Sequence, residues 1–441
     1  MAGPSTGEIR GKAVCFVFLP GGWHGRFLTA DMHAAAGADN LRFGATAGNT
    51  ARVGASNLYL DAATFGSLTR RANMGVLGIR TTTADHPGAQ INMAGFSFAE
   101  LADCAPRRLA AAMVGQAYDP LAHANACALL GVHRSLGGSQ RRSLIRELPA
   151  DAPMRDLRIQ QFSDLGNLLG AAAPVDDPNA AARAAAADDL DAAQRMSQPV
   201  LARHARGTTS LAGAYDSAIA SLRAEPMQTF TPYEDIAPAY SDIAINGGAV
   251  RPADLSGEIF HFATKMAAAE FAIRNCGTKV AVVIDGEIDG RGDPESLDWD
   301  THQGITGGGG AVSLQERMVR RIIPAIEAFT TRMAASGIDV TTVIASEFTR
   351  GVDPTDGPGQ GLATSSIHGG AAVAAVIGSA FQAGTTAQLS VTGRTQLANP
   401  DGYDANWSPL YSLVARGVGL SAAANPFSVT AGRQDHASLL A

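Results

Sequence analysis

A carboxylate and an imidazole lie two residues apart in the segment Trp299-Asp300-Thr301-His302-Gln303, downstream of the apolar run Val280–Ile284. In an extended backbone, residues i and i+2 point the same way, so Asp300 and His302 can converge on one point. Zn²⁺ accepts His and Asp or Glu ligands at about 2.0–2.2 Å, and Mn²⁺ prefers a shell richer in oxygen. The spacing therefore predicts a divalent metal site at the carboxyl edge of a sheet.

Two later segments carry the same chemistry. Glu347 follows an apolar run after one serine, and His368 precedes two glycines, which permit close approach of a backbone. Together with Asp300 and His302 they predict a ligand set of carboxylates and imidazoles, and His24, in a glycine-rich turn, is a further candidate. The metal expected from these donors is Zn²⁺, Mn²⁺ or Ca²⁺.

Each of these residues also has an ordinary structural interpretation. Asp300 could cap a turn, and His302 could bind a backbone carbonyl. Glu347 could begin a helix and form a surface salt bridge with Arg350. His24, next to a tryptophan in a turn, could be purely structural. Spacing alone leaves both interpretations open.

The elements that must position these residues follow from the hydrophobic pattern. Buried or half-buried strands are predicted at Ala13–Leu19, Met74–Ile79, Lys279–Ile284 and Val340–Ala345. Helices are predicted over residues 98–135, Ser256–Arg274, Val312–Ser336 (ended by Gly337) and Trp407–Leu420, and Ala371–Phe381 reads as a small-residue helix or a buried segment. Strands alternating with helices predict an α/β fold with a central mixed or parallel sheet flanked by helices.

The whole chain, residues 1–441, is predicted to form a single α/β domain, and the Ala-, Asp- and Arg-rich stretch 150–225 a helical insertion or cap within it. A net charge of -7 and the lack of a long basic run argue against nucleic acid as a partner. No apolar stretch approaches the ~20 residues that a membrane span needs. The apolar run Ala13–Leu19 is too short for a signal peptide, which predicts a cytoplasmic location for the chain as written. The four scattered cysteines include no CxxC pair, and Cys15 reads as a buried hydrophobe.

Five short motifs, in order along the chain, resemble those of an uncharacterised bacterial family, domain of unknown function 1501. The family motifs are "FLRGGADG", "SHFDAQ", "GGWDTHxxQ", "SEFGR" and "GTDHG". Their counterparts here are Phe18–Gly25, Asp85–Gln90, Trp299–Gln303, Val343–Arg350 and, in weakened form, Ser365–Gly369. Five motifs in order are more specific than any one of them. The family is usually exported to the periplasm by the twin-arginine route.

The family looks like a branch of the alkaline phosphatase and sulfatase superfamily. The resemblance implies two metal ions bound by loops at the carboxyl edge of an alkaline-phosphatase-like sheet. It makes Asp300 and His302 ligands of one metal, places Glu347 where the superfamily has an Asp-His pair, and makes His368 the late histidine ligand. A hydroxyl nucleophile near the second strand would attack phosphorus or sulfur.

The chain departs from this pattern at three positions. The aspartate that follows the first strand of the family is replaced around His24, and the serine of "SHF" appears here as Asp85, with Thr81–Thr83 offering hydroxyls nearby. The pair before His368 has become Ser366-Ile367. Fewer carboxylates weaken the affinity for hard divalent cations.

The leading hypothesis is thus a metal-dependent hydrolase of phosphate or sulfate esters. Thr83 or Asp85 would be the nucleophile, Arg350 or Arg80 would hold the anionic oxygens, and a small anionic ester would be the substrate. The rival is a non-catalytic structural or assembly subunit on the same fold, a homo-oligomer or part of a larger assembly. A third alternative is a binding protein that keeps one metal for stability.

Overall fold

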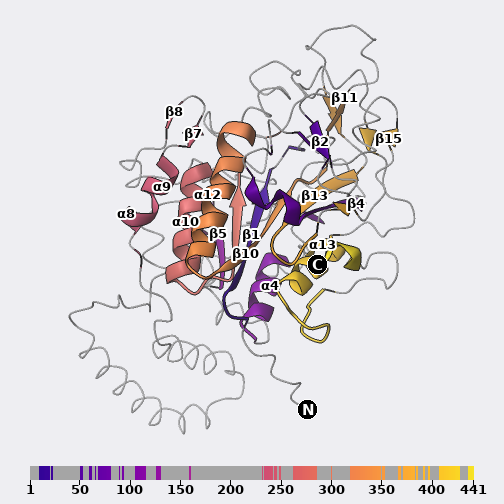
Figure 1. Ribbon diagram of the computed structural model, residues 1–441. Coiled ribbons are helices and arrows are strands. Elements are labelled where there is room, and N and C mark those ends of the chain that lie inside the picture. Colours follow the sequence, from indigo (N-terminus) through magenta and orange to yellow (C-terminus); the bar gives the residue numbers. More distant parts are fainter. Residues whose placement is uncertain are drawn as a thin grey trace, which may run out of the picture.

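An eight-stranded mixed sheet lies at the centre of the described part of the protein (Figure 1). Its strands, in spatial order, are β14 (Gly384–Thr385), β4 (Met74–Arg80), β13 (Ala371–Ile377), β10 (Asp339–Ala345), β1 (Lys12–Phe18), β9 (Val280–Ile284), β5 (Cys127–Leu130) and β6 (Arg158–Ile159). Neighbouring strands are parallel, except that β13 runs antiparallel to both β10 and β4. The predicted class, α/β with a central mixed sheet flanked by helices, is confirmed.

The computed structural model describes residues 9–19, 21–22, 50–52, 59–61, 65, 68–80, 89, 92–93, 105–115, 126–130, 158–159, 231, 233–241, 243–245, 248–249, 262–285, 299, 318–348, 350–352, 366–368, 371–382, 384–385, 391–392, 396–397, 407–427 and 436–441. Outside the main sheet, these residues include the antiparallel pairs β2 (Thr50–Arg52) with β3 (Tyr59–Asp61), β7 (Ala244–Ile245) with β8 (Gly248–Ala249), β11 (Arg350–Val352) with β12 (Ser366–His368), and β15 (Val391–Thr392) with β16 (Gln396–Leu397).

The central strand β1 is apolar on both sides because both faces of the sheet are covered. Ala13, Cys15 and Val17 point into one layer of the core, and Phe16 and Phe18 point into the other. Continuous apolar runs of this kind are typical of parallel strands with helices on both faces. Cys15 behaves as the predicted buried hydrophobe, and burial holds the pKa of its thiol well above the ordinary range.

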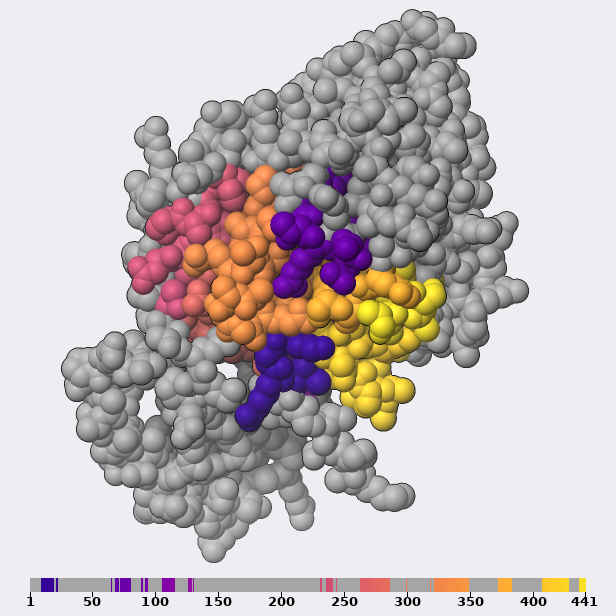
Figure 2. All heavy atoms as spheres, in the orientation of Figure 1, coloured from indigo at the N-terminus to yellow at the C-terminus, as the bar shows by residue number. Residues whose placement is uncertain are grey.

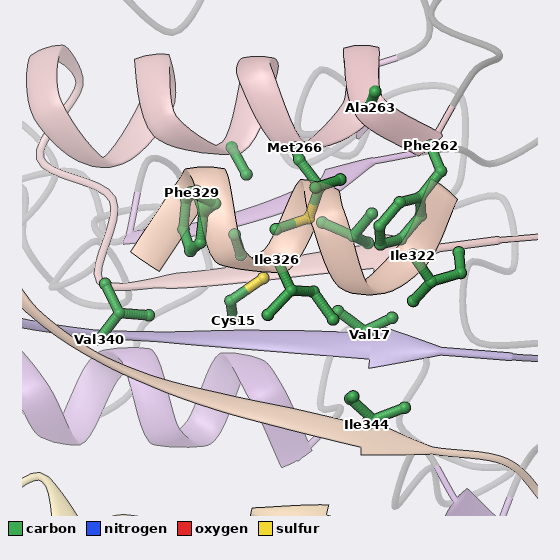
Figure 3. Packing of buried hydrophobic residues seen from close by; sticks show 14 of the residues in the cluster. Cys15, Val17, Phe262, Ala263, Met266, Ile322, Ile326, Phe329, Val340 and Ile344 are labelled. Carbon is green, nitrogen blue, oxygen red and sulfur yellow. The ribbon is translucent and has the colours of Figure 1, made fainter. Parts of the chain in front are cut away.

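The helices α10 (Phe262–Asn275) and α12 (Ile323–Ala335) cover one face of the sheet, with α8 (Tyr233–Ile236) and α9 (Pro238–Ser241) beside them (Figure 1). Figure 3 shows side chains of both long helices, among them Phe262 and Ile326, packed over Cys15 and Val17 of β1. Burial of this apolar surface is the main favourable contribution to folding. The predicted helices at Ser256–Arg274 and Val312–Ser336 are confirmed within their described residues.

The opposite face is covered by α4 (Ala105–Met113) and α13 (Ser408–Gly417), with η9 (Ala437–Leu439) packed in the same layer of the core. The short η3 (Thr69–Asn73) lies against α12, where the Thr69 N–H donates to Glu327 Oε2 at 3.0 Å. Residues far apart in the sequence meet here. Figure 2 shows the beginning of the described chain beside its C-terminal part, and Lys12 Nζ donates a hydrogen bond to the Gly417 carbonyl at 3.4 Å. Both chain segments therefore contribute to the same layer of the core.

The helix that begins at Met318 changes its winding. The segment η8 (Met318–Ile322) is a π-helix, and α12 continues from it with Pro324 in its first turn. Proline has no N–H to donate, so it fits at the beginning of an α-helix and not within one. Gly337, at φ 75°, ends the helix as predicted.

Two sequence predictions need correction. Residues Cys127–Leu130, expected within a helix over 98–135, form β5, parallel to β9. A four-residue apolar run is too short for its periodicity to separate strand from helix. The alternative helix at Ala371–Phe381 is also wrong, because β13 lies between β10 and β4 with its described side chains buried. Burial on both faces overrides the helix propensity of alanine.

The predicted helical insertion at 150–225 falls largely outside the described residues, and the part inside them is the edge strand β6. A helix that spans a bilayer needs ~20 apolar residues. Within the residues that the structure describes, no helix meets that requirement.

A buried ion network joins three helices of the α10 layer. The fully buried carboxylate of Glu270 accepts hydrogen bonds from Tyr240 Oη at 2.8 Å, Arg274 Nη1 at 2.9 Å and Arg332 Nε at 2.8 Å. Burial and the neighbouring Glu270 raise the pKa of Tyr240 well above its ordinary value. This network links the C-terminal turns of α10 and α12, at the end of the sheet opposite to the predicted site.

Candidate functional site

The carboxyl ends of three adjacent parallel strands meet at one edge of the sheet. In the register of the sheet, Phe18 of β1 lies between Ile284 of β9 and Ala345 of β10. The chain therefore leaves all three strands at the same level, and polar residues follow two of them immediately, Asp285 after β9 and Ser346 after β10. Ligand sites of α/β sheets lie outside such edges.

Glu347 lies at this edge and is completely buried. Its Oε1 accepts a hydrogen bond from the Gly21 N–H at 2.8 Å. The Ser346 hydroxyl accepts from the Gly22 N–H at 3.0 Å and has two acceptors for its own proton, the Leu19 carbonyl at 2.6 Å and Glu347 Oε2 at 3.0 Å. The surface salt-bridge interpretation of Glu347 is therefore wrong, because its carboxylate lies inside the protein against the segment that follows β1.

Two consecutive glycines make this contact possible. Gly21 and Gly22 have φ values of 111° and 94°, a region that residues with a Cβ rarely adopt. This conformation directs both N–H groups toward the end of β10. The glycine-rich turn predicted after the first strand is thus confirmed at these residues, and its role is to bind Glu347 and Ser346.

A second buried polar cluster follows β9, and the sequence analysis overlooked it. The carboxylate of Asp285, which is fully buried, forms an ion pair with Arg321 and accepts a hydrogen bond from the Trp299 indole Nε1 at 3.1 Å. Lys265 Nζ donates to the adjacent carbonyl of Ile284 at 2.7 Å. The overlooked signal was an acid directly after a buried five-residue strand, the same signal that pointed to Glu347.

The pairing of β11 with β12 brings together two of the predicted segments. Arg350 is the register partner of His368 in this antiparallel pair. Directly opposed residues of antiparallel strands have Cα atoms about 4.5–5.5 Å apart. Arg350 is only three residues from the buried Glu347. The backbone therefore holds Glu347, Arg350 and His368 in one region, although they come from segments about twenty residues apart in sequence.

The end of β4 reaches the same edge. Arg80, its last residue, pairs with Ala371, the first residue of β13, which follows His368 by three residues. The predicted nucleophiles Thr83 and Asp85 come directly after β4 in the sequence. The strand order β4-β13-β10-β1-β9 thus gathers at one edge the ends of those strands of the main sheet that are nearest in sequence to the predicted site residues.

The remaining predicted site residues, His24, Thr81, Thr82, Thr83, Asp85, Asp300 and His302, lie outside the described residues. Trp299 is described and is buried. Within the described ranges, no group of three or more His, Cys, Asp or Glu side chains could hold a metal ion. Glu347 and His368 are donors of the kinds that Zn²⁺ and Mn²⁺ accept, and the other donors of the predicted set belong to the residues just named.

No protein-family model matches this chain, and no curated protein is similar to it. Among solved structures, the chain is similar to TAB5 alkaline phosphatase, in a mutant form with Mg bound in the M3 site. The identity is 8%, the match covers 85% of this chain and 94% of that chain, and the TM-score is 0.26. A TM-score of this size carries no argument, so the resemblance to the bacterial family and its superfamily stays a prediction.

Proposed function

We propose that this protein is a metal-dependent hydrolase of phosphate or sulfate esters. In this proposal Asp300, His302, Glu347 and His368 bind a divalent cation, and His24 assists them. The cation would be Zn²⁺, Mn²⁺ or Ca²⁺, and the substrate a small anionic ester.

One observation carries the proposal: the main-sheet strands nearest in sequence to the proposed residues end or begin at the same edge of the sheet. The ends of β1, β9 and β10 are in register there, and Arg80 of β4 pairs with the first residue of β13. The backbone pairing of Arg350 with His368 begins three residues after Glu347. Of the proposed ligands, Glu347 and His368 are described, and the strand ends and the β11–β12 pairing support their lying near this edge.

The proposed reaction has two steps. A side-chain nucleophile displaces the alcohol from phosphorus or sulfur, and the leaving oxygen takes up a proton from the nucleophile or from water. Water then hydrolyses the covalent enzyme ester, which releases phosphate or sulfate and restores the side chain. Thr83, through its hydroxyl, or Asp85 supplies the nucleophile. Arg350 holds the non-bridging oxygens, because a guanidinium matches them in a bidentate way, and Arg80 is the alternative. A divalent metal held by the proposed ligands would supply charge stabilisation at the attacking and leaving oxygens.

The experiment is to purify the chain, measure its metal content, and assay an aryl phosphate and an aryl sulfate. His302→Ala should abolish both metal binding and turnover. Glu347→Gln is a sharper variant, because the amide oxygen can still accept the Gly21 N–H while the charge is lost. His204→Ala, in the alanine-rich stretch away from every motif, is the matched control and should retain both. A protein that binds no metal and hydrolyses neither ester contradicts the proposal.

A second candidate is a non-catalytic structural or assembly subunit. The observation that favours it is that the two described carboxylates at this edge already have internal partners: Asp285 pairs with Arg321, and Glu347 accepts the Gly21 N–H. These contacts stabilise a fold without any ligand. Large regular particles or filaments, seen by light scattering and electron microscopy in protein without metal, would support this candidate.

A further inference from the structure

The buried cluster of Asp285, Arg321 and Trp299 includes a residue that directly precedes the proposed metal ligands in sequence. Trp299 is the residue before Asp300 and is three residues before His302. Its indole Nε1 donates to Asp285 Oδ2 at 3.1 Å, and its side chain is buried. The hydrogen bond thus ties the beginning of the predicted ligand segment to the carboxyl end of β9.

Arg321 holds the other oxygen of the same carboxylate. Asp285 Oδ1 accepts from Arg321 Nη2, while Oδ2 accepts from the indole, so each carboxylate oxygen has its own donor. A carboxylate with both oxygens bound cannot rotate freely, and it fixes the direction of the indole N–H. Asp285 itself is held by the sheet, since its backbone N–H donates to the Phe18 carbonyl at 2.9 Å.

The winding of the helix contributes to this geometry. Arg321 belongs to the π-helical turn η8, directly before α12. Wide turns of this kind are rare, and they occur frequently at functional sites. Met318 and Ile322 of the same turn are buried in the core, so the turn is anchored on both sides of Arg321.

We infer that Asp285 and Arg321 are positioning residues, which hold Trp299 and through it orient the ligands Asp300 and His302. The inference rests on the proposed function, because Asp300 and His302 are ligands only in that proposal. It assigns to Asp285 a role that differs from metal ligation: the carboxylate acts on the metal through the indole and the chain, as an outer partner that fixes a ligand. Loss of such partners commonly lowers metal affinity by about 10–100-fold.

The test compares the affinity for Zn²⁺, measured by calorimetry, in the unmodified chain, Trp299→Phe and Trp407→Phe. Trp299→Phe keeps an aromatic ring but removes the N–H. Trp407 is also buried, on the opposite face of the sheet, and is the matched control. We expect the dissociation constant to rise about 10–100-fold in Trp299→Phe and to stay unchanged in Trp407→Phe. A purely structural tryptophan would change thermal unfolding but not the affinity of the folded protein.

Equal Zn²⁺ affinities in the unmodified chain and Trp299→Phe overturn the inference and leave the proposed function standing. An unmodified chain that binds none of Zn²⁺, Mn²⁺ and Ca²⁺ overturns both. A measurement without a variant at Trp299 covers the case in which Trp299→Phe does not fold: in protein labelled with ¹⁵N-tryptophan, Zn²⁺ should shift the Trp299 indole resonance and not that of Trp407. A Trp299 resonance that stays in place when Zn²⁺ binds also overturns the inference.

Discussion

The ion pair between Asp285 and Arg321 makes a quantitative prediction. The side chains are 0% and 1% exposed, so neither charge can be hydrated if its partner is removed. Removal of one member of a buried ion pair typically costs about 3–5 kcal/mol, because the other charge stays buried after its partner is lost, and we expect about this loss for Arg321→Met.

The double variant, with Asp285→Asn and Arg321→Met together, should lose less free energy of unfolding than the two single variants lose in sum. Asp285→Asn keeps an oxygen to accept the Trp299 N–H and removes the negative charge. In a double-mutant cycle, residues in contact show coupling energies of about 0.5–3 kcal/mol, and full burial places this pair toward the upper end. Unfolding in urea, followed by circular dichroism, gives the four free energies of unfolding that the cycle requires.

A partly exposed ion pair in the same protein is the matched control. Arg70 Nη1 lies 3.5 Å from Asp339 Oδ1, and the two side chains are 27% and 33% exposed. Pairs of this kind contribute about 0.2–1 kcal/mol, so the cycle of Arg70→Met with Asp339→Asn should show weak coupling. A cost below about 1 kcal/mol for Arg321→Met, or a coupling no larger than that of the control pair, would refute the argument from burial.

Three further predictions concern other parts of the fold. Gly417→Ala should destabilise the protein by about 1–3 kcal/mol, since an added Cβ would lie 2.5 Å from Phe381 Cζ; thermal unfolding measures the loss, and Phe381→Leu in the same chain should recover part of it. Burial raises the pKa of the Cys276 thiol from 9.0 to about 12. The unfolded chain therefore releases this proton first as the pH rises, and the free energy of unfolding should fall by about 1.4 kcal/mol per pH unit between those values. Cys276→Ala should lack that contribution in urea unfolding at a series of pH values, and an identical pH dependence would contradict it. Tyr240→Phe should cost about 1.5–3 kcal/mol, because the lost hydroxyl donates to the buried carboxylate of Glu270; an unchanged urea midpoint would show that this hydrogen bond contributes nothing.

Most of the main sheet follows from the sequence for a clear physical reason. The strands β1, β9 and β10 are apolar runs of five to seven residues, bounded by turn residues, and helices with an apolar stripe separate them in the chain. The sequence predicts a helix at β5, because an apolar run of four residues does not show a strand period. For β13 it does not separate a helix from a buried segment, because alanine favours helices in isolation. In both cases the neighbouring strands decide the conformation, and they come from distant parts of the chain.

The candidate site was predictable in type and not in detail. A carboxylate directly after a buried strand identified Glu347, and the same reasoning applied to Asp285 would have found the second cluster. The partners of these carboxylates could not be predicted from the sequence. The contact of Glu347 with Gly21 depends on the register of β1 with β10, and the pair of Asp285 with Arg321 depends on a π-helical turn. Neither can be read from local spacing.

Metal content tests the central claim most directly. Protein purified without chelators, then dialysed with Zn²⁺ or Mn²⁺ and freed of excess ion, should retain about one or two divalent ions per chain, as a metal-assisted hydrolase requires. Glu347→Gln and His302→Ala should each retain clearly less, while His204→Ala matches the unmodified chain. If the unmodified protein retains no more metal than His302→Ala, the strand ends share one edge of the sheet without forming a metal site, and the hydrolase proposal is wrong.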